Sequence, residues 1–538
     1  MLRLIVGLVL ACSINNMVLA GGDDSLAVRL DALAAAKLSK MPAQIDLLAG
    51  MDDPRAAVVL QALLDGQLYA RKSDKRLFIA TPAADKSLLL TDPLGLVQPG
   101  AAKKNEFKRI AVNNRMRSQL RYAIARANLQ SPDPLQRQAA VLRLLDDLDP
   151  AVLVLLDEAA EDESDEGVLG LVYIARGMIA LDSDDRLEKM AAIELLSGNL
   201  QPLVKNRLQQ VLARDDNGDL LETDAVIVKK ARVALAAIDS KAGVYKFLET
   251  TFFGLSLGSV LLLSAIGLAI TFGVMGVINM AHGELIMLGA YTTYVVQLMM
   301  PDHLEYSLLV AVPAAFLVSG LVGVAIERGI IQFLYGRPLE TLLATFGVSL
   351  ILQQAVRSIF SPLNRSVATP EWMSGALQIN PVFALTYNRM YILVFALIVF
   401  VLLLLLLKKT TLGLQFRAVA QNRAMARAMG IRSQWVDAMT FGLGSGIAGI
   451  AGVALSQLTN VGPNLGQAYI IDSFMVVVFG GVGNLWGTLV SAFSLGVASK
   501  FVEPMAGAVL AKILILVFII LFIQKNPRGL FPQQGRAE

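Results

Sequence analysis

Two patterns of apolar and polar residues divide the chain. From Phe252 onward, apolar stretches follow one another with few charged residues between them. Several approach the ~20 residues that a helix needs to cross ~30 Å of hydrocarbon. We therefore expect a polytopic bundle of about eight transmembrane helices over residues 247–538, with 470–482 a short or re-entrant segment. The apolar stretches are 252–275, 285–300, 308–326, 342–360, 390–407, 438–458, 470–482, 489–501 and 509–523.

Residues 21–246 have instead the shorter apolar spacing of amphipathic helices. Asp–Pro pairs recur before such stretches, as at Asp53-Pro54 and Asp149-Pro150. Proline fits the first turn of a helix, and the preceding Asp can cap its free N–H groups. Short helices at these intervals predict stacked pairs of the HEAT-like kind. Residues 66–112 interrupt the pattern, where a small β-hairpin or a long insertion loop fits. The predicted fold class is all-α, a helical-repeat domain followed by a transmembrane bundle.

The first twenty residues have the pattern of a secretory signal peptide. Arg3 precedes an apolar run, and small residues end at Ala20. Cleavage there would place residues 21–246 in the periplasm. Two alternatives remain. The residues before Cys12 loosely match a lipoprotein cleavage box, which would lead to lipidation of Cys12, or the N-terminal segment stays uncleaved as a membrane anchor.

Charge separates the two halves and orients the second. Residues 21–246 hold 30 Lys and Arg against 33 Asp and Glu, a solvated surface without the basic excess that nucleic-acid binding needs. Residues 408–435 carry six basic residues and no acid. The positive-inside rule then places this segment and the C-terminus in the cytoplasm. The sequence has one cysteine and two histidines. These are too few for a disulfide within the chain, for a Cys-based metal site or for a multi-His metal site.

A polar segment interrupts the apolar stretches at 276–284. Polar groups at membrane depth are costly unless they face protein or water, and broken helices line many solute sites. We name five candidate residues of a solute path, two of them outside this segment: Asn279, His282, Glu284, Gln457 and Asn484. Asn484 lies in a second glycine-rich break, at 480–487. The alternative is that His282 and Glu284 are solvated at the cytoplasmic interface.

The basic segment 408–435 is the candidate element for coupling to a soluble motor. It is alanine-rich and predicts one or two short helices that stop at Gly430. Its candidate contact residues are Arg417, Arg423, Arg427 and Gly430. The alternative is an amphipathic loop held by anionic lipid.

Five segments resemble the branched-chain amino acid permease family of bacterial ABC transporters. They are 254–259 (GLSLGS), 276–284 (GVINMAHGE), 417–431, 480–487 (GGVGNLWG) and 526–530 (NPRGL), within a resemblance that covers roughly residues 250–530. Within that family, permeases of the urea-transporting type also have a signal peptide and a helical extension before the first span. The architecture of this chain resembles theirs. The Glu-Ala-Ala form of the coupling motif is absent, so the contacts of the coupling segment are not assigned residue by residue.

The resemblance implies a transport subunit rather than an enzyme. It would form the path with a second homologous permease in the bacterial inner membrane, receive solute from a periplasmic solute-binding protein, and depend on two cytoplasmic ATPases. This chain would hold no cofactor, and it lacks the phosphate-loop motif, so ATP would be used by the partner subunits. Urea or a short-chain amide is the expected solute. A branched-chain amino acid is the alternative, and it would need groups for its ammonium and carboxylate.

Three other functions remain as rivals. A passive channel or secondary transporter would need no ATPase, which would leave the coupling segment without a role. An intramembrane enzyme would need a paired-Asp, Ser–His or metal constellation within the spans. A sensor would need a cytoplasmic signalling domain after the spans.

Overall fold

The computed structural model describes residues 23–36, 40–51, 53–82, 87–95, 100–145 and 150–531. The expected signal peptide and Cys12 lie outside these residues. The chain divides into two compact units, Met1–Lys241 and Ala242–Glu538, here called unit 1 and unit 2. The division falls within helix α11 (Ala225–Met275).

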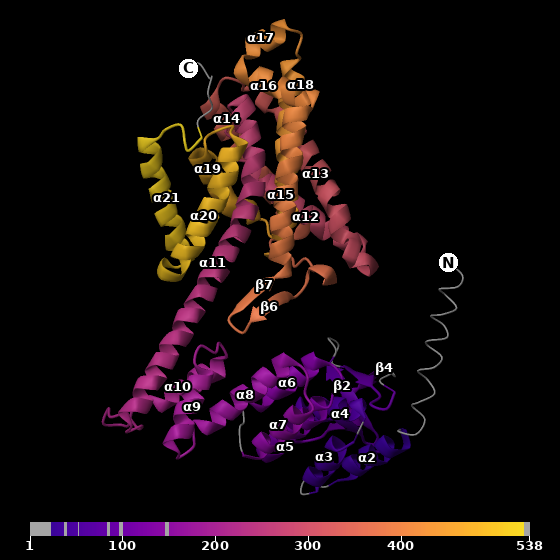
Figure 1. The fold of residues 1–538 in the computed structure, drawn as a ribbon. Coiled ribbons are helices and arrows are strands. Elements are labelled where there is room, and N and C mark those ends of the chain that lie inside the picture. Colours follow the sequence, from indigo (N-terminus) through magenta and orange to yellow (C-terminus); the bar gives the residue numbers. More distant parts are fainter. Residues whose placement is uncertain are drawn as a thin grey trace, which may run out of the picture. The chain divides into compact units, whose positions relative to one another are not determined.

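Short helices make up most of unit 1 (Figure 1). Several begin where an Asp side chain caps them. Asp53 accepts a hydrogen bond of 2.9 Å from the N–H of Arg55, and Asp165 one of 2.9 Å from that of Val168. The helices are α2 (Asp23–Ala35), α3 (Met41–Ala49), α4 (Pro54–Leu64), α5 (Asn114–Leu129), α6 (Pro134–Leu144), α7 (Pro150–Glu161), α8 (Glu166–Ala180), α9 (Arg186–Leu196) and α10 (Pro202–Val211).

A five-stranded antiparallel sheet lies between α4 and α5 in the sequence, which corrects the all-α prediction. Its strand order is β4-β3-β2-β1-β5. The expected hairpin accounts for only part of it, because β1 also pairs with β5, some forty residues later, and local patterns do not show such pairing. No HEAT repeat is evident among the described residues. The strands are β1 (Leu68–Arg71), β2 (Leu77–Pro82), β3 (Ser87–Thr91), β4 (Gly100–Lys103) and β5 (Phe107–Arg109).

Unit 2 contains all nine of the helices that the apolar stretches predict. Seven helices of the described chain, counting α11, are long and apolar enough to cross a membrane, against the expected eight. The remaining two, α12 (His282–Met299) and α19 (Leu465–Gly480), have 18 and 16 residues. The other six after α11 are α13 (Leu304–Gly329), α14 (Pro338–Phe360), α15 (Tyr387–Lys409), α18 (Ser433–Ser456), α20 (Leu485–Ala506) and α21 (Ala508–Lys525).

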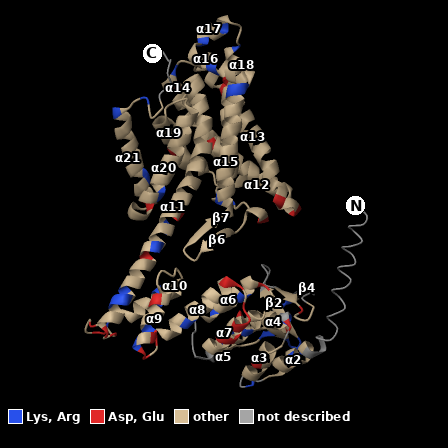
Figure 2. Cartoon of the chain, viewed as in Figure 1, with Lys and Arg blue, Asp and Glu red and all other residues tan. Residues whose placement is uncertain are grey.

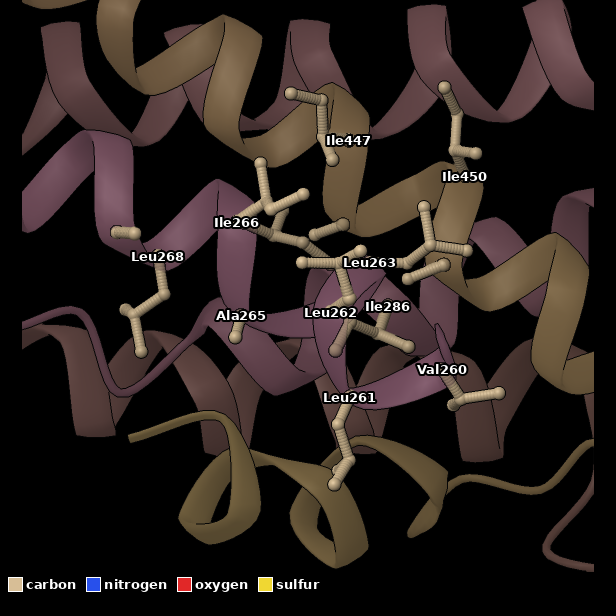
Figure 3. Close-up of a cluster of buried hydrophobic side chains, with 14 of the residues drawn as sticks. Val260, Leu261, Leu262, Leu263, Ala265, Ile266, Leu268, Ile286, Ile447 and Ile450 are labelled. Carbon is tan, nitrogen blue, oxygen red and sulfur yellow. The ribbon is translucent and has the colours of Figure 1, made fainter. Parts of the chain in front are cut away.

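The core of unit 2 forms where α11, α12, α13 and α18 pack together. Figure 3 shows Leu263 and Ile266 of α11 beside Ile447 of α18. Small residues let these backbones approach closely, as is typical of membrane helices. A Cβ at Gly289 of α12 would lie 2.6 Å from the carbonyl carbon of Gly449 of α18, so neither helix has room for a larger residue there.

The two ends of unit 2 differ in charge and in structure. One end carries the short helices α16 (Thr411–Gln421) and α17 (Arg423–Ala428), and Lys and Arg gather there (Figure 2). The other end carries the hairpin β6 (Ala376–Asn380) and β7 (Phe383–Thr386). The loop before the hairpin is fixed to the bundle, because Gln297 of α12 exchanges hydrogen bonds of 2.8 and 2.9 Å with the backbone of Ala368.

Candidate solute site and coupling element

The chain turns back into the bundle after α11. Gly276, with φ of 69°, ends the helix, and residues 277–281 run without regular structure. His282 then places Nε2 at 2.7 Å from the carbonyl oxygen of Ser264. Ser264 lies eleven residues before Met275, which is about 16 Å back along α11 at 1.5 Å per residue. Helix α12 therefore begins well inside the bundle rather than at its surface.

The re-entrant segment buries three of the candidate residues. Asn279, His282 and Glu284 are 1%, 0% and 1% exposed in unit 2. The alternative in which His282 and Glu284 are solvated at an interface does not describe this structure. Buried polar groups at this depth need protein partners, and only some of theirs are present.

Glu284 is the best connected of the three. Its Oε1 accepts hydrogen bonds from Ser349 Oγ at 3.0 Å and Gln353 Nε2 at 2.7 Å, both on α14. Its Oε2, together with Asn279 Nδ2 and His282 Nδ1, has no hydrogen-bond partner in the described part of the chain. The cluster thus offers one donor, Asn279 Nδ2, and two acceptors, Glu284 Oε2 and His282 Nδ1, because Nε2 of His282 must carry the hydrogen that the Ser264 carbonyl accepts. Donors and acceptors of these kinds are complementary to a solute with N–H groups and a carbonyl oxygen.

A second short helix begins at the same place. A Cβ at Gly283 would lie 2.8 Å from the carbonyl carbon of Gly466, which is in the first turn of α19. The N-termini of α12 and α19 therefore meet inside the bundle. Helix N-termini carry partial positive charge and free N–H groups, and discontinuous helices build the solute sites of many transporters. Arg357, one turn beyond Gln353 on α14, donates a hydrogen bond of 2.8 Å to Asn464, which precedes α19.

The other two path candidates lie apart from this cluster and have local roles. Asn484 caps α20, because its Oδ1 accepts from the N–H of Gly487 at 3.1 Å, and its Nδ2 donates to the carbonyl of Phe531 at 3.2 Å. Gln457 ends α18 and lines an apolar cavity of about 260 Å³ between α13, α15 and α18. A role of any of the five in the solute path stays a prediction.

The coupling segment folds as α16 and α17, and an ion pair fixes it to the bundle. The Arg423 guanidinium donates two hydrogen bonds, of 2.6 and 2.7 Å, to the carboxylate of Asp437 in α18. The same guanidinium lies 3.8 Å from the centre of the Tyr335 ring. Gly430, with φ of 88°, follows α17 and marks the end of the short helices, as the sequence predicts.

The two remaining arginine candidates of the coupling segment differ in their surroundings, since one is hydrogen-bonded to the backbone and the other is exposed. The guanidinium of Arg417 donates to the carbonyl of Leu407, so it fixes α16 to the end of α15. Arg427 is exposed on α17, beside Met425 and Met429, which are 61% and 77% exposed. These exposed residues form a surface that a soluble partner could contact.

Sequence reasoning missed Ser349, Gln353 and Asp437. Ser349 and Gln353 are four residues apart in an apolar stretch, so they share one face of α14, and this spacing was the available signal. Asp437 lies at the start of an otherwise apolar helix. Its partner, fourteen residues earlier, is visible only once the chain has folded.

Comparison with known proteins places residues 250–523 in one family. The model described as "Branched-chain amino acid transport system / permease component" matches this range. The high-affinity branched-chain amino acid transport system permease protein BraD of Pseudomonas aeruginosa is 30% identical over 304 residues, 55% of this chain and 98% of BraD. LivH of Salmonella typhimurium, with the same description, is 30% identical over 303 residues, 54% of this chain and 96% of LivH. No solved structure gives a significant match.

Proposed function

We propose a solute, partners and an orientation for this chain, which belongs to the family of permease components of branched-chain amino acid transport systems. Family membership makes it a multi-pass membrane protein and a transport subunit, without a catalytic domain and without a cofactor. Its translocation path would form with a second homologous permease. Two cytoplasmic ATPases and a periplasmic solute-binding protein would complete an importer of the bacterial inner membrane.

The observation that carries a transport role is the junction of α12 and α19 inside the bundle. A helix that only anchors a protein gains nothing from a break that buries Asn279, His282 and Glu284, because each unpaired polar group costs free energy. A solute that satisfies these groups in passing would offset that cost. We infer that the junction contributes to the path.

Urea or a short-chain amide is the proposed solute. A neutral amide offers N–H groups to Glu284 Oε2 and a carbonyl oxygen to Asn279 Nδ2, which matches the unpartnered atoms. The resemblance in architecture adds support, since residues 1–249 precede the family match and urea-type permeases carry an extension there.

A branched-chain amino acid is the second candidate, because it is the solute that the descriptions of BraD and LivH name. Its ammonium group could bind to Glu284, and Arg357 of the neighbouring turn could receive its carboxylate. The two candidates therefore differ in whether Arg357 binds solute.

The surface of α17 is proposed to contact an ATPase. The exposed methionines and Arg427 form it, and the Arg423–Asp437 pair would transmit its movement to α18, which packs against α12. The gathering of basic residues at this end supports a cytoplasmic position. Unit 1 would then lie in the periplasm.

Uptake measurements test the solute directly. Cells with this chain deleted and then restored would be given labelled urea and labelled leucine at micromolar concentration. Loss and rescue of urea uptake alone, abolished when ATP is depleted, would support the urea importer. Loss of leucine uptake instead would move the solute to branched-chain amino acids, and uptake that survives ATP depletion would contradict an ATP-driven importer.

The role of unit 1 needs a separate test. We propose that it contacts the binding protein or the partner permease. A chain without residues 21–240 should then assemble poorly or take up less solute. Unchanged assembly and uptake would remove an essential docking role.

A further inference from the structure

We propose that unit 2 holds a binding site for the phosphate of an anionic phospholipid headgroup, between the end of α13 and the C-terminal part of the coupling segment. The site is a hollow of about 640 Å³ that Arg328, Arg427 and Arg432 line together with Ile431, Ser433, Gln434 and Trp435. It is separate from the α12–α19 junction and requires nothing of the proposed solute, and it shares Arg427 with the surface of α17 that is proposed to contact an ATPase.

Three elements bring the arginines together. Arg328 is in the last turn of α13, Arg427 in the last turn of α17, and Arg432 directly before α18. The sequence distance between the first two is about a hundred residues, so folding, and not a local basic run, creates the cluster. All residues that line the hollow are described, and none of them is a carboxylate. Guanidinium groups bind phosphate oxygens in pairs, which makes such a cluster suited to a phosphate monoanion.

The nearby acids do not neutralise the hollow. Asp437 is engaged by Arg423, and its side chain is 7% exposed. Glu327 is 2% exposed and lies 3.6 Å from Arg328 Nε, a contact that leaves the other Arg328 nitrogens available. Counting Arg328, Arg423, Arg427 and Arg432 against these two acids leaves an excess of two positive charges.

The start of α18 adds to the attraction for an anion. Arg432 precedes the helix without any side-chain cap, and no acid occupies the first turn. Ser433 and Gln434, the first two residues of this 24-residue helix, line the hollow, and the first N–H groups of a helix have no partner within it. Their partial positive charge favours a phosphate.

The level of the hollow in the fold favours a lipid over a free anion. Arg328 ends one membrane-spanning helix, and Arg432 to Trp435 begin another. Trp435, 53% exposed, has the amphipathic ring that gathers at the boundary between hydrocarbon and headgroups. Basic pockets between spans at this level are where anionic headgroups bind. A diacyl lipid would place its phosphate in the hollow and its chains along α13, most of which is not buried in unit 2.

The test measures lipid binding to the purified full-length chain. The probes are dioctanoyl phosphatidylglycerol, dioctanoyl phosphatidylcholine and inorganic phosphate, each titrated in neutral detergent. We expect phosphatidylglycerol to bind most tightly and the double variant Arg328→Gln/Arg432→Gln to weaken it about tenfold. The matched control is Lys408→Gln/Lys409→Gln, which removes the same charge from the same end of unit 2 but outside the hollow. It should change the affinity less than twofold.

Several results would overturn the proposal. Equal losses in the two double variants would show attraction to general surface charge, and equal binding of the two lipids would remove the phosphate site. Inorganic phosphate that competes as well as the lipid would assign a free-anion site. Lipid that is fully displaced when the ATPases assemble would assign the hollow to a protein interface. If the double variant unfolds, Arg432→Gln alone, compared with Arg432→Lys, replaces it; the lysine variant should retain more of the affinity.

Discussion

Unit 1 and unit 2 satisfy their polar groups in opposite ways. In unit 1, Asp side chains cap helices and ion pairs lie on the surface, as where Lys205 donates a hydrogen bond of 2.7 Å to Asp239. In unit 2, glycines bring backbones together, and buried polar side chains stay partly unpartnered, as with Glu284 and Asn279.

The difference follows from the solvent of each unit. Water can serve any exposed group of unit 1, so a lost cap or ion pair there has a small cost. Hydrocarbon offers no hydrogen bonds, so unit 2 gains stability from close packing and can keep an unpaired polar group only where it has a use. We therefore expect substitutions to have graded effects, large in the packing of unit 2 and small on the surface of unit 1.

The largest effect should follow from filling the contact between α12 and α18. Gly289→Leu would place a branched side chain against the Gly449 backbone, and we expect a loss of about 4 kcal/mol or more, enough to prevent folding. The yield of folded chain in the membrane, by size-exclusion chromatography, measures it. Gly347→Ala on α14, where a Cβ meets nothing within 4 Å, is the control. Equal yields for both variants would contradict the packing argument.

Loss of the buried carboxylate should abolish transport while the fold persists. Glu284→Ala removes the acceptor and leaves Ser349 and Gln353 without their shared partner, so we expect uptake to fall at least tenfold at normal membrane abundance. Glu305→Gln, an exposed acid at the start of α13, should leave uptake unchanged. Normal uptake by Glu284→Ala would show that the cluster is not on the path.

A moderate effect is expected where the coupling segment meets the bundle. Arg423→Leu leaves the Asp437 carboxylate buried and unpaired, and we expect uptake to fall several-fold while ATP hydrolysis by the complex continues. The double variant Arg423→Leu/Asp437→Leu, which leaves no unpaired charge, should recover assembly but not tight coupling. Lys500→Gln breaks a half-buried ion pair within α20, away from the coupling segment, and serves as the control. Full coupling in the double variant would show that the pair only stabilises the fold.

The smallest effect should come from lowering the pH, which weakens an ion pair of unit 1. The Arg137 guanidinium lowers the pKa of Glu163 below its ordinary 4.5, although burial opposes this. Because the folded pKa is the lower one, the pair stabilises unit 1 fully above pH 4.5, and this stability is lost as the pH falls through the folded value. Hydrogen exchange of α6 and α8 in the full chain should quicken over that range, and less so in Glu163→Gln. Identical pH profiles would contradict the role of the pair.

Sequence patterns predict the helices of this chain far better than its sites. All nine apolar stretches became helices, because hydrophobic runs of that length have few other solutions. The sheet of unit 1 was missed in part, since β1 finds β5 only after chain reversal. Asn279, His282 and Glu284 stood out as polar residues in an apolar context. Their partners on α14 and the approach of Gly466 depend on tertiary packing, which no local pattern shows.

The most direct test of the central claim is the accessibility of Asn279 to solute. Asn279→Cys would be made in a chain whose one native cysteine, Cys12, is replaced by serine. The assembled importer would then be treated with a small hydrophilic thiol reagent during ATP turnover, with and without solute. We predict labelling that requires turnover and is slowed by the transported solute. A cysteine that stays unlabelled in every state, in a variant that still transports, would contradict a path through the α12–α19 junction.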